Sequence, residues 1–153
     1  MSQARRAWNP LSLMLCDVDC FKDVNTRFGH LTCDVVLANP AALLKYSVRG
    51  SDAVFRYGGD EFLIILADTS CTDARHVVER VRNGLAEWNR AGHLEKFDLS
   101  LSIGVAEWTE GRTRDDLLVG AYHQVCAAKA RRQCGQGQAA GGDILQHSSP
   151  CAY

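Results

Sequence analysis

The sequence has no long hydrophobic run and almost no net charge. No stretch of its 153 residues approaches the roughly 20 apolar residues of a membrane-spanning helix, so no membrane segment is expected in the chain. Residues 1–10 also lack the apolar core of a signal peptide, which predicts a cytoplasmic location. The formal net charge of -1 provides no basic field, and this argues against nucleic acid as a general partner.

The sequence also lacks a Cys-x-x-Cys pair, although it contains seven cysteines. An odd number of cysteines at mostly apolar positions predicts reduced thiols that pack as small core residues, rather than zinc ligands or disulfides. The hydrophobic content of 46% and the charged content of 23% are typical of a globular protein. The length fits one domain that can bury a core.

Hydrophobic periodicity predicts the order strand, helix, strand, strand, helix, strand, helix. This β-α-β-β-α-β succession is typical of the ferredoxin-like split motif, so we expect an α+β fold with a central antiparallel sheet flanked by helices. Residues 1–9 are expected to form a short lead-in, residues 10–132 the domain and residues 133–153 a disordered tail. Strands are expected at 11–16, on both sides of the glycines within 52–66, and at 97–105. A polar helix or turn is expected at 21–30, and helices are expected at 31–48, 71–91 and 113–132.

Two residues interrupt the predicted helices. Gly29 is expected to end the first helical segment as a C-cap. Pro40 either kinks the second segment or begins a new helix that Asn39 caps, and the sequence leaves both options open. The helix at 71–91 has Thr72 and Asp73 as candidate caps.

The run Gly58-Gly59-Asp60-Glu61 separates two apolar segments of strand composition. Two glycines predict a hairpin turn, because both can adopt a positive φ at little cost. Strand alternation then sends the next two side chains to opposite faces, so that one acid can point into a cleft beside bare backbone. Asp17 follows the first predicted strand, where it either caps a turn or joins these acids around a shared divalent cation.

Four motifs carry a resemblance to a known family. They occupy residues 17–25 (Asp-Val-Asp-Cys-Phe-Lys-Asp-Val-Asn), 29–34 (Gly-His-Leu-Thr-Cys-Asp), 56–62 (Arg-Tyr-Gly-Gly-Asp-Glu-Phe) and 102–106 (Ser-Ile-Gly-Val-Ala). In this order and spacing the chain resembles the GGDEF domains of the diguanylate cyclase family over residues 10–129. The resemblance implies a palm-like fold similar to that of class III nucleotide cyclases and polymerases.

The resemblance also implies an activity. Such enzymes make cyclic di-GMP from two GTP with release of two pyrophosphates, and each GTP is held by one of two antiparallel domains, so a homodimer is needed for catalysis. Asp17, Asp60 and the carbonyl of Val18 would bind Mg²⁺ or Mn²⁺. Asp60 would also take the proton of the attacking 3'-hydroxyl. Lys22 would stabilise charge on the phosphates.

The substrate-binding positions follow from the same resemblance. Asn25 and Asp34 match residues that read guanine, and an aspartate acceptor suits the N1–H and N2–H donors of that base. Bare backbone at the two glycines would let the phosphates approach, and a lysine of the last helix would bind them. The positions are Asn25, His30, Asp34, Gly58, Gly59, Glu61 and Lys129. Each residue taken alone could instead be an ordinary surface, turn or capping residue.

Arg49 and Asp52 match the R-x-x-D inhibitory site of the family, nine residues before the first motif glycine. An arginine can bind guanine and phosphate with two parallel hydrogen bonds, and an aspartate can accept from the base. Arg80 matches a second arginine that is sometimes found there, although a surface arginine is the simpler explanation. The resemblance therefore implies inhibition by the product, cyclic di-GMP.

The chain departs from the family pattern in several places. It begins just before the first strand, where the family has a helical L-T-G-L-x-N-R segment, so we expect a truncated product or a misassigned start. Thr26, Cys33 and Pro40 are unusual at their positions. Gln133 stands where the family has a phosphate-binding arginine, and Arg131 or Arg132 could take the place of that arginine. The alternatives are a weak or inactive GGDEF domain that binds GTP or cyclic di-GMP, and a non-functional fragment.

Overall fold

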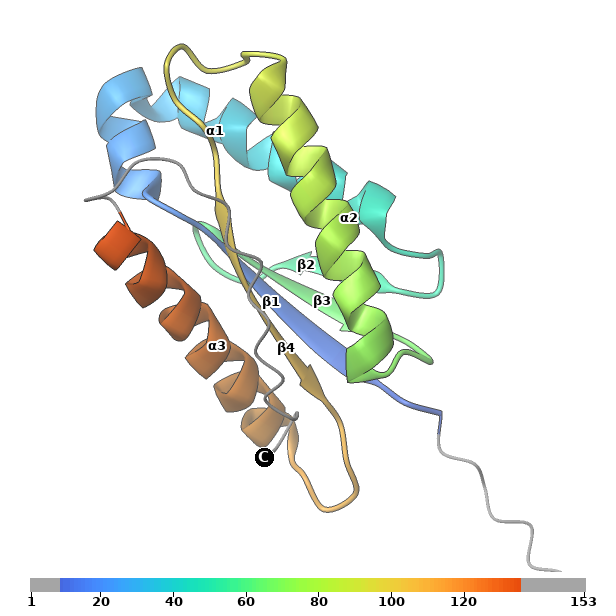
Figure 1. Ribbon diagram of the computed structural model, residues 1–153. Helices are drawn as coiled ribbons and strands as arrows, with labels where there is room; N and C mark the ends of the chain where they lie inside the picture. Colours follow the sequence, from blue (N-terminus) through green and yellow to red (C-terminus); the bar gives the residue numbers. More distant parts are fainter. Residues whose placement is uncertain (1–8, 136–153) are drawn as a thin grey trace, which may run out of the picture.

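The computed structural model describes residues 9–135, which fold as a sheet covered by helices (Figure 1). Their order along the chain is the predicted one. The elements are β1 (Ser12–Val18), α1 (Phe21–Ser47), β2 (Ala53–Arg56), β3 (Glu61–Leu66), α2 (Cys71–Arg90), β4 (Leu101–Glu107) and α3 (Arg114–Gly135).

The strands form one antiparallel sheet in the order β2-β3-β1-β4. This is the ferredoxin-like arrangement, in which β1 and β3 occupy the centre, and it confirms the predicted fold class. Asp17 on β1 lies opposite Glu61 on β3 and opposite Ser102 on β4. The end of β1 therefore lies beside the start of β3.

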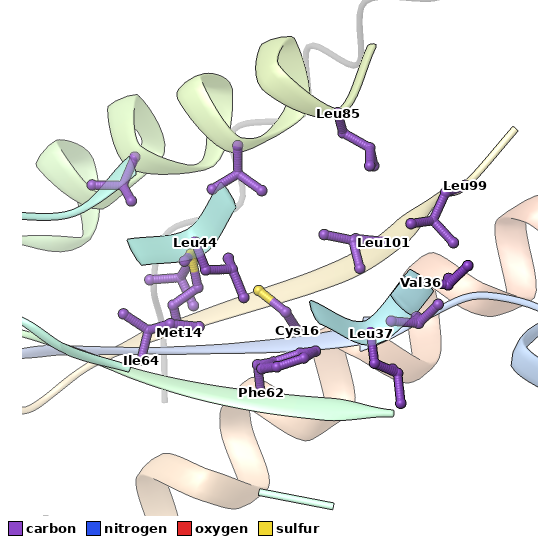
Figure 2. Packing of buried hydrophobic residues seen from close by; sticks show 14 of the residues in the cluster. Met14, Cys16, Val36, Leu37, Leu44, Phe62, Ile64, Leu85, Leu99 and Leu101 are labelled. Carbon is purple, nitrogen blue, oxygen red and sulfur yellow. The ribbon is translucent and has the colours of Figure 1, made fainter. Parts of the chain in front are cut away.

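The helices lie on both faces of the sheet. In Figure 1, α1 and α2 cover one face and α3 lies against β1 and β4 on the other. The alternation along β1 explains this, because Met14 and Cys16 pack into the larger core under α1 and α2, whereas Leu13 and Leu15 pack against α3. Figure 2 shows the larger core, where the ring of Phe62 lies beside Cys16.

Helix α1 contains both residues that were expected to interrupt it. Gly29 has φ 81° and ψ 168°, so the helical backbone breaks there as predicted. Pro40 lies inside the helix. Asn39 is not a cap, because its side-chain amide donates to the carbonyl of Val35 at 3.0 Å. The option of a new helix starting at Pro40 is therefore wrong.

Several predicted boundaries differ from the structure. The cap of α2 is Ser70, whose hydroxyl accepts from the Asp73 N–H at 3.1 Å, rather than Thr72 or Asp73. Strand β4 begins at Leu101 rather than at residue 97. Asn89 holds the preceding loop, because its side chain pairs with both the N–H and the carbonyl of Leu99. Helix α3 extends to residue 135, beyond the expected start of the tail.

Among the described cysteines, the prediction of reduced cysteines packed in the core holds in full only for Cys16 and Cys33, because Cys20 and Cys126 are reduced but exposed. Cys71 departs from the prediction because it is disulfide-bonded. The side chain of Cys134 is not among those that the structure describes, and Cys151, like the rest of the predicted tail from residue 136 onward, lies outside the described residues. Within residues 9–135, no helix is both long and apolar enough to span a membrane.

Candidate active site

The candidate site forms where the end of β1 meets the turn between β2 and β3. The N–H of Val18 donates to the carbonyl of Asp60 at 2.9 Å, and Asp17 lies opposite Glu61 in the sheet register. Because the two central strands run antiparallel, Asp17 becomes a neighbour of Asp60 and Glu61, which are distant from it in sequence. The sequence predicted this meeting of Asp17 with the acids of the turn.

The carboxylate of Asp17 is buried and only partly satisfied. Its Oδ2 lies 2.8 Å from the ammonium of Lys129, and its side chain is 8% exposed. Its Oδ1 is buried without a hydrogen-bond partner among the described residues. The pKa of Asp17 is raised to about 6, because burial and the charges of Asp60 and Glu61 outweigh the opposing effect of the Lys129 hydrogen bond. An ionised carboxylate in this position would gain from a second cation.

The ammonium of Lys129 on α3 also responds to these acids. Burial acts to lower its pKa, but the hydrogen bond to Asp17 and the charges of Asp17, Asp60 and Asp19 together raise it. Lys129 is therefore a firmly protonated counter-ion. No group of three or more His, Cys, Asp or Glu side chains within residues 9–135 is arranged to bind a metal. A cation here would need ligands in addition to the carboxylates.

The turn that carries the acids is held by hydrogen bonds rather than by left-handed glycines. Neither Gly58 nor Gly59 has a positive φ, so that part of the prediction is wrong. Arg56 donates from Nε to the carbonyl of Gly58 at 3.3 Å and from Nη2 to that of Gly59 at 2.8 Å. The N–H groups of Tyr57 and Gly58 both donate to the carbonyl of Glu61. Bonds from both sides therefore fix the turn.

The two glycines allow other groups to come close to the backbone of the turn. A Cβ on Gly58 would lie 2.9 Å from Oε2 of Glu61, so a side chain there would displace that acid. A Cβ on Gly59 would meet nothing within 4 Å, so the turn leaves open space at this position. The hairpin thus presents bare backbone beside the carboxylates, as the sequence predicted.

A second acid, Asp19, is fully engaged. It accepts from the hydroxyls of Ser100 at 2.8 Å and Ser102 at 2.6 Å, and it pairs with Arg132 of α3. Arg132, a candidate substitute for the missing phosphate-binding arginine, is thus bound to a carboxylate. Sequence analysis missed this pair, although its acid follows Asp17 by two residues and its arginine follows the lysine of α3 by three.

A cavity of about 370 Å³ lies between α1 and the β2–β3 hairpin. Its polar lining residues are Asp34, Lys45 and Arg56, and its apolar ones are Leu37, Ala38, Ala41, Val54 and Phe62. Arg56 both lines this cavity and holds the turn, a double involvement that sequence analysis missed. An apolar cavity with a few polar groups is typical of a small-molecule site.

The other predicted nucleotide contacts lie outside that cavity. Neither Asn25 nor His30 lines it, and Gly29 breaks the helix between Asn25 and Asp34. Asn25 is half-buried, and its Oδ1 is buried without a hydrogen-bond partner in the described part of the chain. His30 is exposed, as is Lys22 in the first turn of α1. The structure therefore brings Asp34, but not Asn25, to the cavity.

The R-x-x-D segment forms a closed turn after α1. Asp52 accepts from the N–H of Arg49 at 2.8 Å and from the N–H of Ala67 at 3.0 Å, so both carboxylate oxygens bind backbone. Arg80 on α2 donates to the carbonyl of Ser47 at 3.0 Å. This bond places Arg80 and Arg49, both exposed, at the same end of α1.

The comparison with known families identifies the domain. A family model described as "Diguanylate cyclase, GGDEF domain" matches residues 1–134. The chain belongs to the GGDEF family. Its match with "Diguanylate cyclase DosC" of Escherichia coli K12 is 37% identical over 132 residues, and its match with "Response regulator PleD" of Caulobacter vibrioides is 38% identical over 133 residues.

These matches cover 86% and 85% of this chain but only 29% of each relative's length. The crystal structure of the GGDEF domain of YfiN (TpbB) from Pseudomonas aeruginosa superposes with a TM-score of 0.70 at 31% identity, covering 80% of this chain and 78% of that one. The resemblance and the palm-like α+β fold inferred from sequence are confirmed.

Proposed function

We propose that this GGDEF domain is a diguanylate cyclase, which condenses two GTP into cyclic di-GMP and releases two pyrophosphates. The observation that carries the proposal is the buried Oδ1 of Asp17, which has no partner among residues 9–135 and lies near the acids Asp60 and Glu61 of the glycine turn. Relatives named diguanylate cyclase support the same enzyme class.

The residues present fit a divalent cation, Mg²⁺ or Mn²⁺. Asp17 offers a buried oxygen that no described residue satisfies, and the nearby charges of Asp60 and Glu61 raise the pKa of Asp17, which a cation would reverse. Asp17, Asp60 and the carbonyl of Val18 would bind the ion, and nucleotide phosphates would complete its coordination. When bound, such an ion supplies positive charge to the phosphate oxygens.

The chain's own side chains would perform the remaining steps. The Asp60 carboxylate would accept the proton of the 3'-hydroxyl as that oxygen attacks the α-phosphate of the other GTP. Lys22 and Lys129 would bind phosphate oxygens, where a point charge suffices. The open backbone at Gly58 and Gly59 would let the phosphates come close.

Guanine would occupy the cavity between α1 and the hairpin. The Asp34 carboxylate lines that cavity and would accept from N1–H and N2–H, two donors that adenine does not present together. The unsatisfied Oδ1 of Asn25 would accept another donor of the nucleotide, with His30 nearby in sequence. Glu61 would brace the turn from the side opposite Arg56.

Catalysis would require a homodimer, because each domain binds one GTP and each new bond joins nucleotides on two domains. Cyclic di-GMP would also act as an inhibitor that binds Arg49 and Arg80 at the exposed end of α1. Asp52 would contribute by keeping the Arg49 turn closed, since its carboxylate binds backbone. We place this reaction in the cytoplasm, where GTP is available.

Incubation of the purified chain with GTP and Mg²⁺, followed by chromatography, tests the proposal. We expect cyclic di-GMP and pyrophosphate in a 1:2 ratio, and none from Asp60→Asn, which keeps the size of the side chain but removes its basicity. Circular dichroism of both proteins controls for folding. A folded wild-type protein that makes no cyclic di-GMP at saturating GTP would contradict the proposal.

A second candidate is a catalytically weak or inactive domain that binds GTP or cyclic di-GMP. The observation that favours it is the contact of Lys129 with Asp17, because an ammonium on Oδ2 competes with a metal ion. Tight binding of cyclic di-GMP without turnover, lost in Arg49→Ala, would support this candidate.

A further inference from the structure

The cavity between α1 and the hairpin is lined by a positively charged side chain, that of Lys45, to which the proposed reaction assigns no role. Lys45 and Asp34 both line it, and neither forms a hydrogen bond or an ion pair with another described residue. The third charged group, Arg56, already donates to the carbonyls of Gly58 and Gly59. Lys45 is therefore the one cation in the described cavity lining that is available to a ligand.

The spacing along α1 fits a purine between the two side chains. Asp34 and Lys45 are eleven residues apart, which is about 16 Å along a helix axis. Helical side chains lean toward the amino terminus, so a fully extended lysine brings its ammonium back by at most about 6 Å toward Asp34. The remaining gap of about 10 Å accommodates a purine edge with a hydrogen bond at each end.

The position of the acids determines which way the base of a bound nucleotide would extend along α1. Asp17 and the glycine turn lie at the amino-terminal end of α1, which begins at Phe21, so Asp34 is nearer to them along the helix than Lys45 is. A nucleotide with its phosphates at the acids extends its base along α1. The atom at position 6 of a purine, farthest from the sugar, then points toward Lys45.

We propose that Lys45 reads the O6 of guanine while Asp34 reads N1–H and N2–H, which makes Lys45 a specificity-determining residue. This inference rests on the proposed function. A lysine is a suitable donor to guanine O6, whereas adenine presents an amino donor at position 6 that an ammonium cannot bind. Asp34 and Lys45 are exposed, and the apolar walls formed by Leu37, Val54 and Phe62 would hold the base plane beside them.

Binding of 6-thioguanosine triphosphate tests this inference, because that nucleotide keeps N1–H and N2–H but has a weak sulfur acceptor in place of O6. Calorimetry with Mg²⁺ would compare it with GTP, both in 3'-deoxy form so that no condensation occurs. Wild-type protein should bind the guanine form about tenfold more tightly. Lys45→Met should lose that preference, through weaker binding of the guanine form alone.

Tyr46→Ser is the matched control, because Tyr46 is the next residue on α1, is 90% exposed and does not line the cavity. It should keep the tenfold preference. An unchanged preference in Lys45→Met would overturn the assignment of Lys45 while leaving the proposed function intact. A wild-type protein that binds neither nucleotide would refute the proposed function, and the assignment with it.

Discussion

Replacing Lys129 with methionine should increase the affinity of the nucleotide-free domain for Mn²⁺. In the structure the ammonium lies 2.8 Å from Oδ2 of Asp17, which is one of the two oxygens of the proposed metal ligand. A cation that binds both carboxylate oxygens, or that binds Oδ2, must displace this ammonium. Methionine keeps the length of the side chain and removes the competing charge.

The size of the effect follows from the exposure of the pair. Hydrogen bonds between charged groups contribute about 1.5 to 3 kcal/mol, and Lys129 is 37% exposed, so solvent screening favours the lower end of that range. About 1.4 kcal/mol corresponds to a tenfold change in the dissociation constant, so Lys129→Met should bind Mn²⁺ about tenfold more tightly than the wild type. The loss of a positive charge beside Asp17, Asp60 and Glu61 acts in the same direction.

Electron paramagnetic resonance of free Mn²⁺ measures this affinity without nucleotide or turnover. Lys129→Arg is the matched control, because it retains a cation that can pair with Asp17 and should therefore bind Mn²⁺ as weakly as the wild type. Asp17→Asn should abolish binding in all backgrounds. If Lys129→Met binds Mn²⁺ no more tightly than the wild type, the competition inferred from the ion pair is wrong.

Three further predictions concern stability, measured by urea unfolding with tryptophan fluorescence. The pKa of Asp17 is raised from 3.8 to about 6, so the folded state binds its proton more tightly and this residue destabilises the metal-free domain as pH rises from 4 to 7, by about 3 kcal/mol. Asp17→Asn should remove that part of the pH dependence, and an unchanged profile would contradict the stated cause. Gln124→Ala should cost about 1 to 3 kcal/mol, because the amide exchanges two hydrogen bonds with the backbone of Val105, and a loss below 0.5 kcal/mol would show that water replaces them. Gly104→Ala should cost about 3 kcal/mol or more, because its Cβ would lie 2.1 Å from the carbonyl of Ala121, and wild-type stability in that variant would refute the close approach.

The sequence predicted those features that depend on local periodicity and on motif spacing. The apolar run at residues 11–16 predicted a strand there, and the order of elements predicted the antiparallel sheet. The break at Gly29 followed from its conformational freedom. The meeting of Asp17 with Asp60 followed from the central position of their strands, which the split motif dictates.

The features that the sequence did not predict depend on contacts between distant residues. Nothing in the local sequence of Arg56 indicates that its side chain returns to two carbonyls of the next turn. The glycine pair suggested left-handed backbone, but these two bonds hold the turn without it. The pairing of Asp19 with Arg132 joins residues 113 positions apart, and only the docking of α3 makes it visible.

The docking of α3 explains how the domain could give up the contact of Lys129 without losing the helix. Three other attachments remain on α3, namely the pairing of Arg132 with Asp19, the two bonds of Gln124 and the close approach at Gly104. Gln124 precedes Lys129 on α3 and Arg132 follows it, so the helix is attached on both sides of the lysine. The ammonium can therefore leave Asp17 by a local movement of its side chain. Cation binding should therefore change the contacts of Lys129 and leave the backbone of α3 in place. The released ammonium then stays beside the acids, where it can bind a nucleotide phosphate.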